Sequence, residues 1–151
     1  MGVFIEDLMN FGNLIDTELE IKLSAQELAT AYPELDFEIK EGILRIFINR
    51  RVLFWNRKVE VRLSEGGGVK KDRENQSQWV FFKVLSKAGL EDILKLDAFR
   101  LDGEYVGMEV MKAVSLTESY RKIPRQFLEK LLINRYKMGK DSLSVFFRFE
   151  K

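Results

Sequence analysis

The sequence contains neither cysteine nor histidine among its 151 residues. The lack of cysteine excludes disulfides and thiolate metal sites. The lack of histidine removes the usual general base, the imidazole of a catalytic triad and the commonest metal ligand. A chain of this length buries about 68–70% of its unfolded surface, so it needs neither a disulfide nor a bound metal to be stable. We therefore predict one domain over residues 1–151, without catalytic activity, cofactor or metal.

Long apolar runs are also missing. No stretch of 18 apolar residues occurs, so no segment is expected to span a membrane as a helix. The start, MGVFIEDLMN, has two acids by position 7 and lacks the pattern of a signal peptide. We expect a cytoplasmic location for the chain as it stands, and an exported one where a signal or anchor has been removed.

The net charge of +1 conceals a separation of signs. Residues 1–41 hold ten acids and two bases, a net of −8, whereas residues 42–63 hold six bases and one acid, a net of +5. Such a separation can steer a charged partner, or the acidic and basic parts can neutralise each other in the fold. The sequence leaves both interpretations open.

Short amphipathic elements fill the first half of the chain. Residues 3–15 carry apolar side chains at helical spacing, and 18–23 and 35–40 alternate as strands do. LSAQEL (23–28) is a capping box, in which Ser24 and Glu27 can bond each other's amides. It predicts a helix from Ala25 to about Tyr32.

The stretch GILRIFINRRVLFWNRKVEVRL (42–63) mixes apolar and basic residues. We interpret it as a strand pair or three-strand meander, with turns near Asn49 and at Asn56-Arg57. In the last strand, Val59, Val61 and Leu63 alternate with charged neighbours and should face inward. The cations therefore concentrate at the turns, which suits a head-group rim or plain solvation better than a nucleic-acid platform.

The second half predicts further hairpins and one long helix. Residues 64–78 are polar and glycine-rich, so we expect a mobile loop, and their triple glycine lacks the rest of a phosphate-binding motif. Residues 79–85 and 141–151 are expected strands, and 99–110 a hairpin with its turn at Asp102-Gly103. The apolar stripe and terminal signals of 123–139 predict a helix.

Together these elements predict an α+β fold. We expect a curved antiparallel sheet of about seven or eight strands wrapped on the long C-terminal helix, with short N-terminal helices.

Four kinds of function remain to be weighed. The acids at 97, 102, 104 and 109 could support acid–base catalysis, although acids beside a hairpin turn are usually just solvated. The basic stretch 45–62, with its aromatic residues, could bind single-stranded nucleic acid, but no known recognition pattern supports it. Twelve phenylalanines leave apolar groups on both faces of several strands, which favours either a ligand groove or a solid core completed by a homodimer partner.

The order of motifs resembles that of the bacterial relatives of the tubular lipid-binding (TULIP) superfamily. The matching pieces are LSAQEL (23–28), FEIKEGILRI (37–46), KVEVRL (58–63), the polar loop 64–78, IPRQFLEKLL (123–132) and LSVFFRF (143–149). The long basic stretch 45–62 and the acidic segment 1–41 depart from that pattern. The resemblance implies a curved sheet rolled around a helix, with a non-polar lumen for an acyl chain.

We therefore predict non-covalent binding of a lipid, a fatty-acid-like molecule or another amphipathic ligand, with possible contact to a membrane surface. The residues expected to line an apolar groove are Phe81, Phe127, Leu128, Leu131, Leu132, Phe147 and Phe149. The residues expected to meet an anionic head group or surface are Arg50, Arg51, Arg57 and Lys58. The alternatives are a solid-core interaction module that forms homo-oligomers and, third, a single-stranded nucleic-acid binder.

Overall fold

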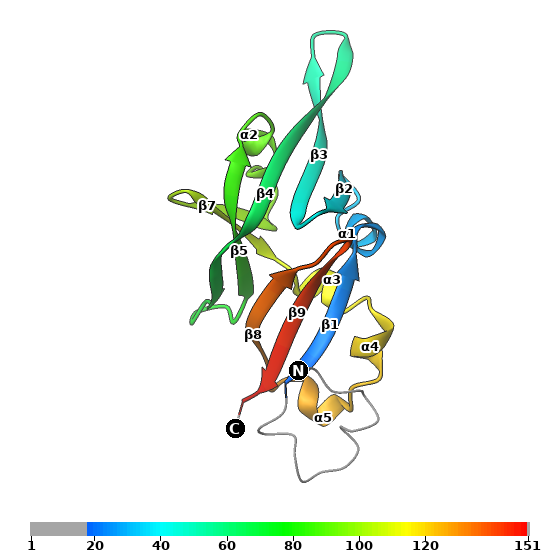
Figure 1. The fold of residues 1–151 in the computed structure, drawn as a ribbon, viewed down its shortest axis with the longest axis vertical. Coiled ribbons are helices and arrows are strands. Elements are labelled where there is room, and N and C mark those ends of the chain that lie inside the picture. Colours follow the sequence, from blue (N-terminus) through cyan, green and yellow to red (C-terminus); the bar gives the residue numbers. More distant parts are fainter. Residues whose placement is uncertain (1–17, 151) are drawn as a thin grey trace.

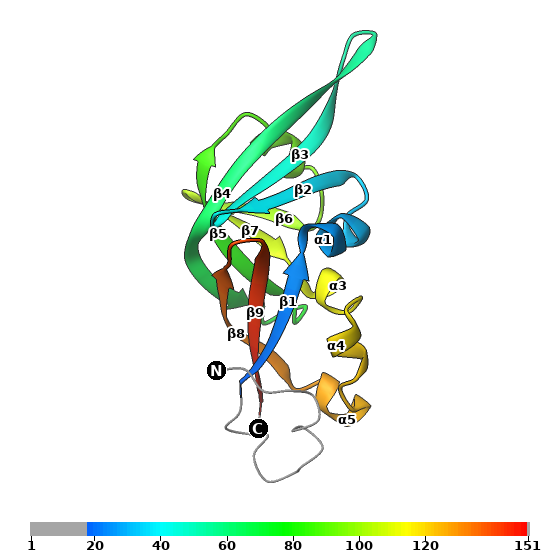
Figure 2. The same ribbon diagram turned by 45° about the vertical axis from the view of Figure 1, so that its right-hand side comes forward.

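Two antiparallel sheets account for most of the computed structural model, which describes residues 18–150. The larger sheet has six strands, in the spatial order β2 (Leu35–Lys40), β3 (Ile43–Val52), β4 (Trp55–Lys71), β5 (Gln78–Ser86), β7 (Tyr105–Glu109) and β6 (Phe99–Asp102). The smaller sheet has three, in the order β1 (Leu19–Ser24), β9 (Ser142–Phe149) and β8 (Leu131–Met138). Figures 1 and 2 show the smaller sheet beside one end of the larger one.

Five short helices connect or flank the strands in the described part of the chain. They are α1 (Ala25–Ala31), α2 (Leu90–Ile93), α3 (Met111–Val114), α4 (Glu118–Arg121) and α5 (Arg125–Leu128). The predicted capping box at the start of α1 is confirmed: the Glu27 amide donates to the Ser24 hydroxyl oxygen, and the Ser24 amide donates to the Glu27 carboxylate. This local signal needs no tertiary contact to act, which is why the sequence alone placed α1.

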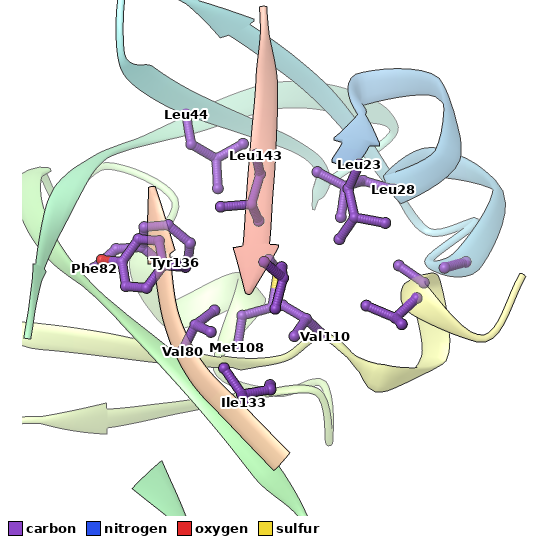
Figure 3. Packing of buried hydrophobic residues seen from close by; sticks show 14 of the residues in the cluster. Leu23, Leu28, Leu44, Val80, Phe82, Met108, Val110, Ile133, Tyr136 and Leu143 are labelled. Atoms are coloured by element: carbon purple, nitrogen blue, oxygen red, sulfur yellow. The ribbon is translucent and has the colours of Figure 1, made fainter. Parts of the chain in front are cut away.

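The hydrophobic core lies between the two sheets. Figure 3 shows side chains from both of them in one cluster, with Phe82 of β5 beside Tyr136 of β8, and with Leu44 of β3 and Leu143 of β9 among the other members. The Phe82 and Tyr136 rings have centroids 5.0 Å apart in a tilted arrangement. Leu28 of α1 is fully buried at the edge of the same cluster, so the capped helix closes one side of the core.

Side chains of the larger sheet satisfy the outer edge of β8. The Gln78 amide group donates to the Leu131 carbonyl (3.1 Å) and accepts from the Ile133 amide (2.6 Å), as a neighbouring strand would. Further along, the Met138 amide donates to the Glu65 carboxylate (2.7 Å). These bonds remove unpaired groups from a strand edge and fix one sheet against the other.

The predicted fold class was wrong. Strands make up 56% of the described residues and helices 17%, and the only helix there of seven or more residues is α1. Within residues 18–150 no long C-terminal helix exists for a sheet to wrap around. The expected helix at 3–15 lies outside the described residues.

The predicted helix 123–139 is the main error. Its apolar stripe begins with Phe127 and Leu128, which lie in α5, and continues through residues 131–133, which lie in β8. Residues 131–138 form a strand with a bulge, where the register against β9 shifts between Ile133 and Arg135. The buried positions Ile133 and Tyr136 are therefore three residues apart, as on a helix face. A bulge inserts one extra residue into the alternation, so a strand can acquire helical spacing.

The polar segment 64–78 is divided between strand and connection. Residues 64–71 continue β4, and 72–77 lead into β5. The triple glycine is a bulge in β4, where the register against β5 shifts between Glu65 and Val69. Gly67 has φ +83°, and a Cβ there would lie 2.8 Å from Phe81 and Tyr105 side-chain atoms, so glycine is required.

The terminal strand and the 99–110 hairpin were predicted correctly. In β9, Leu143, Val145, Phe147 and Phe149 are buried as the alternation indicates. β6 and β7 pair up to Asp102 and Tyr105, so the turn residues are Gly103 and Glu104, one position later than expected. Gly103 has φ +62°, which is the left-handed conformation that such a turn needs.

Candidate functional site

The hairpin of β3 and β4 projects beyond the rest of the molecule. Figure 1 shows it reaching upward past every other element, and Figure 2 shows the same from another side. The two strands pair without interruption from Ile43 with Ser64 to Val52 with Trp55. The predicted turns near Asn49 and at Asn56-Arg57 were therefore wrong, because both residues lie inside paired strands and the single turn is Leu53-Phe54.

The tip of this hairpin is apolar and exposed. We define the tip as Leu53, Phe54 and Trp55, whose exposed fractions are 75%, 95% and 59%. Phe54 makes almost no contact that stabilises the fold. Large apolar side chains gathered at the end of a projecting element mark an interaction site rather than a packing site.

The turn has a backbone conformation that is unfavourable for a leucine. Leu53 has φ +54°, in the left-handed region that two-residue hairpin turns usually fill with glycine or asparagine. A non-glycine residue held there costs of order 1 kcal/mol or more. The leucine side chain recovers none of this cost by burial, since it is mostly exposed.

Cations surround the tip on both faces of the hairpin. Arg51 and Arg57 are exposed and have no hydrogen-bond or ion-pair partner among residues 18–150. Arg57 pairs across the strands with Arg50, whereas Arg51 pairs with Asn56, so the two free guanidinium groups start from opposite faces. Two arginines directly opposite each other repel, which destabilises the hairpin unless an anion lies nearby.

The other two predicted head-group contacts have partners within the protein. Arg50 binds the Asp92 carboxylate, with its closest nitrogen–oxygen distance 2.6 Å, and donates to the Ala88 carbonyl (2.8 Å). Lys58 lies 3.4 Å from the Asp36 carboxylate, and its ammonium is 5.1 Å from the centre of the Phe47 ring. Of the four predicted cations, Arg51 and Arg57 are thus the ones left available for an external anion.

Lower on the hairpin, the remaining cations of the stretch 45–62 are already paired. Arg45 binds both Glu38 (2.7 Å) and Glu60, and Arg62 binds Glu60 at 3.1 Å. These arginines hold the pKa of the Glu60 carboxyl below its usual value, against the opposing effect of its partial burial. A nucleic-acid platform along the strands would need these guanidinium groups free. These ion pairs therefore do not favour binding of single-stranded nucleic acid.

Most of the predicted groove residues are buried by the protein itself. Phe81, Leu131, Phe147 and Phe149 are buried, so protein atoms already surround them. Phe127, Leu128 and Leu132 are partly buried, and the Phe127 ring packs edge-on against Phe149 with centroids 5.9 Å apart. Leu131, Phe147 and Phe149 belong to one core cluster, against which Phe127 and Leu128 of α5 pack at the end of the molecule away from the hairpin tip (Figure 1). Phe81 and Leu132 are not in that cluster, and Phe81 lies against Gly107 with the Arg100 guanidinium over its ring.

The predicted acids do not gather at one place. Asp97 and Glu109 line an open depression of about 420 Å³, together with Tyr32, Lys95 and Lys112, whereas Asp102 and Glu104 are exposed at the β6–β7 turn. Burial raises the pKa of Glu109, and its carboxylate accepts the Met111 amide (2.9 Å) at the start of α3. This carboxylate thus accepts the first amide of that helix. Within residues 18–150, no three acidic side chains gather in a way that could hold a metal ion.

Sequence reasoning missed the tip. Leu53, Phe54 and Trp55 read as ordinary strand residues because apolar side chains usually mark a core. The signal that could have found them is the break in alternation: four consecutive apolar residues, 52–55, stand between Arg51 and Arg57. Asp92 was missed as well, because the sequence does not show that α2 lies against the hairpin.

Comparisons add no relative for this chain. No protein-family model matches it, and no curated protein or solved structure matches it either. The resemblance to the tubular lipid-binding superfamily therefore remains a prediction. In the described part of the chain, no helix is long and apolar enough to cross a bilayer.

Proposed function

We propose that this protein is a non-catalytic binding module that attaches to an anionic phospholipid membrane through the tip of the β3–β4 hairpin. One observation carries the proposal: Leu53, Phe54 and Trp55 are exposed at the end of a projecting arm. On each strand an arginine without a partner among the described residues lies two positions further back. The amphipathic ligand expected from the sequence is kept, but it is placed outside the protein rather than in a lumen.

The chemistry of the tip matches the layers of a lipid surface. Fully burying a large apolar side chain contributes about 1.5–3 kcal/mol. Each cation held near an anionic leaflet adds about 1 kcal/mol. Tryptophan favours the boundary between acyl chains and head groups, where its ring is apolar and its N–H remains hydrated. These contributions suit reversible, salt-sensitive attachment.

The geometry sets a shallow depth. Successive strand residues are about 3.3 Å apart, so the turn extends about 7 Å beyond Arg51. Surface-bound apolar groups typically reach about 5–10 Å into the head-group and acyl boundary. With the turn at the boundary between head groups and acyl chains, Arg51 and Arg57 would lie at the level of the phosphates.

The arrangement favours a lipid over a pocket in another protein. A protein pocket usually receives one face of a hairpin, whereas this tip has free cations starting from both faces. A bilayer surrounds an inserted group on all sides, so it can satisfy both. The turn peptide groups also remain near the hydrated boundary, where water can bond them.

Vesicle binding tests the proposal. We expect the wild-type protein to sediment with phosphatidylglycerol vesicles at low salt, to be released as salt rises, and to bind phosphatidylcholine vesicles weakly. Emission from Trp55 should shift to shorter wavelength on binding, while Trp79, which is already buried, provides an internal constant. Brominated lipids should quench Trp55 most when the bromine lies near the head groups.

A matched pair of variants separates the tip from general hydrophobicity. Leu53→Ser with Phe54→Ser should lose binding, whereas Leu85→Ser with Leu116→Ser should keep it, since Leu85 and Leu116 are exposed elsewhere. Equal losses in both variants would refute the proposal. So would self-association that the tip variant abolishes, or salt-sensitive retention by single-stranded oligonucleotides that depends on Arg51 and Arg57 without Phe54.

A further inference from the structure

We infer that Arg50 and Asp92 form a brace that holds the projecting arm, residues 49–58, at a fixed angle to the body. Arg50 is then a positioning residue and not a ligand of the lipid head group. The consequence for membrane binding rests on the proposed function, whereas the brace itself is a property of the free protein.

The contact is built as a fork. Arg50 Nε lies 3.2 Å from both Asp92 carboxylate oxygens, and a terminal nitrogen lies 2.6 Å from one of them and 2.8 Å from the Ala88 carbonyl oxygen. Such paired, charge-assisted bonds fix orientation as well as distance. The bonds from Arg50 hold the pKa of the Asp92 carboxyl below its usual value, so the pair stays charged at neutral pH.

Asp92 lies on a segment that is packed against the core. Ile93 and Leu90 are buried in the core beside Asp92. The Gly89 amide donates to the Glu60 carbonyl of β4 (3.0 Å), and a Cβ on Gly89 would lie 3.2 Å from a Val61 methyl. The segment carrying Asp92 therefore lies directly on the base of the hairpin and cannot shift independently of it.

The arm needs such a support. Val59 is the last buried position of β4 toward the tip, and beyond it only Arg50 and Val52 of the arm are half-buried while its other residues are exposed. A two-stranded ribbon is only marginally stable by itself. The opposed cations Arg50 and Arg57 would weaken it further, and Asp92 neutralises one of them. A braced arm presents its tip without losing freedom on binding.

Amide exchange in the free protein tests the brace. In Arg50→Gln and in Asp92→Asn, amides of 49–58 should exchange about tenfold faster, as the loss of a charged hydrogen bond predicts. Asp36→Asn is the matched control, since it removes one carboxylate that pairs with Lys58 on the same hairpin, and it should leave exchange near the tip unchanged. Exchange that stays at the wild-type rate in both brace variants would overturn the inference.

Vesicle binding then distinguishes the two possible roles of Arg50, because they predict opposite changes in affinity for Asp92→Asn. If Arg50 acts as a brace, Arg50→Gln and Asp92→Asn should each weaken binding to phosphatidylglycerol vesicles by about threefold. The double variant should weaken it no further. As a head-group ligand, Arg50→Gln would weaken binding while Asp92→Asn, which frees Arg50, would strengthen it. That opposite response contradicts the inference.

A further variant distinguishes loss of the brace from general misfolding, and the experiments can reject the proposed function and the brace independently. Arg50→Lys keeps the charge but loses the fork, so it should also speed exchange in the arm while slowly exchanging amides of β9 stay protected. If wild-type protein ignores anionic vesicles, the proposed function fails but the exchange result still decides the brace. Unchanged exchange rejects the brace whatever the protein binds.

Discussion

The two ends of the β3–β4 hairpin have similar side chains and opposite surroundings. At one end Leu63 is fully buried, and the strand continues into a glycine bulge held by Tyr136 of the other sheet. At the other end Trp55 and Arg57 extend into solvent with one partner strand and no second layer. Apolar residues at the packed end stabilise the fold, whereas those at the free end do not, which leaves them available for an external partner.

The largest effect should come from the packed end. Leu63→Ala removes a fully buried side chain from the core, so the free energy of unfolding should fall by about 2–5 kcal/mol. Urea denaturation followed by circular dichroism measures this. A loss below 0.5 kcal/mol, which is typical of surface positions, would show that the core is not where the structure places it.

The free end should respond in binding and not in stability. Phe54→Ala should leave the urea midpoint unchanged, because the side chain is 95% exposed. Its loss should lower the partition onto anionic vesicles about tenfold, since burial of such a side chain contributes about 1.5–3 kcal/mol. A lower urea midpoint with unchanged partition would reverse the roles assigned to the two ends.

Tyr136 makes the packed end sensitive to alkali. Burial raises the pKa of Tyr136 to about 12, while its bond from the Gly66 amide opposes this shift. The hydroxyl accepts the Gly66 amide (2.8 Å) and donates to the Phe81 carbonyl, so Tyr136→Phe should cost about 1–3 kcal/mol at pH 8 by leaving those groups unpaired.

The pH dependence has a definite sign. A pKa that is higher in the folded state means that the folded protein holds the proton more tightly. The contribution of Tyr136 to stability is therefore complete below the unfolded pKa, about 10, and falls as the pH rises toward 12. Unfolding titrations between pH 9 and 12 should decline less steeply in Tyr136→Phe than in the wild type, and parallel curves would exclude this role.

The smallest effect should be a gain in stability at the turn. Leu53→Gly relieves the left-handed conformation at φ +54°, so the free energy of unfolding should rise by about 0.5–1 kcal/mol. The same change should weaken vesicle binding, because one apolar side chain of the tip is lost. A variant that is less stable than the wild type would show that Leu53 contributes to the fold.

Local signals were the predictable part of the fold. The alternation of 143–149 and the capping box at Ser24 both depend on neighbours within a few residues, so β9 and α1 could be located from the sequence. The helix predicted over 123–139 failed because its apolar stripe crosses from a short helix, α5 with Phe127 and Leu128, into the strand β8, and the spacing of these residues fits a helix as well as a strand. Pairing with β9, which is a tertiary contact, decided between the two.

The candidate site was predictable only in part. Arg51 and Arg57 were expected to face an anionic surface, and the structure leaves both unpaired among the described residues. Arg50 was assigned to the same surface, but its partner Asp92 lies 42 positions away in the sequence. No local pattern connects them, because the contact exists only once α2 has packed on the hairpin.

The sequence by itself determined the chemistry available: no thiol or imidazole, an arginine-rich apolar stretch, and strands marked by alternation. Only the tertiary structure decided where each apolar residue lies. Leu63 and Phe54 carry equally apolar side chains, and the former is enclosed by two sheets while the latter is 95% exposed. Burial depends on which strands meet in space, and this difference separates a residue that holds the fold together from one that is free to bind.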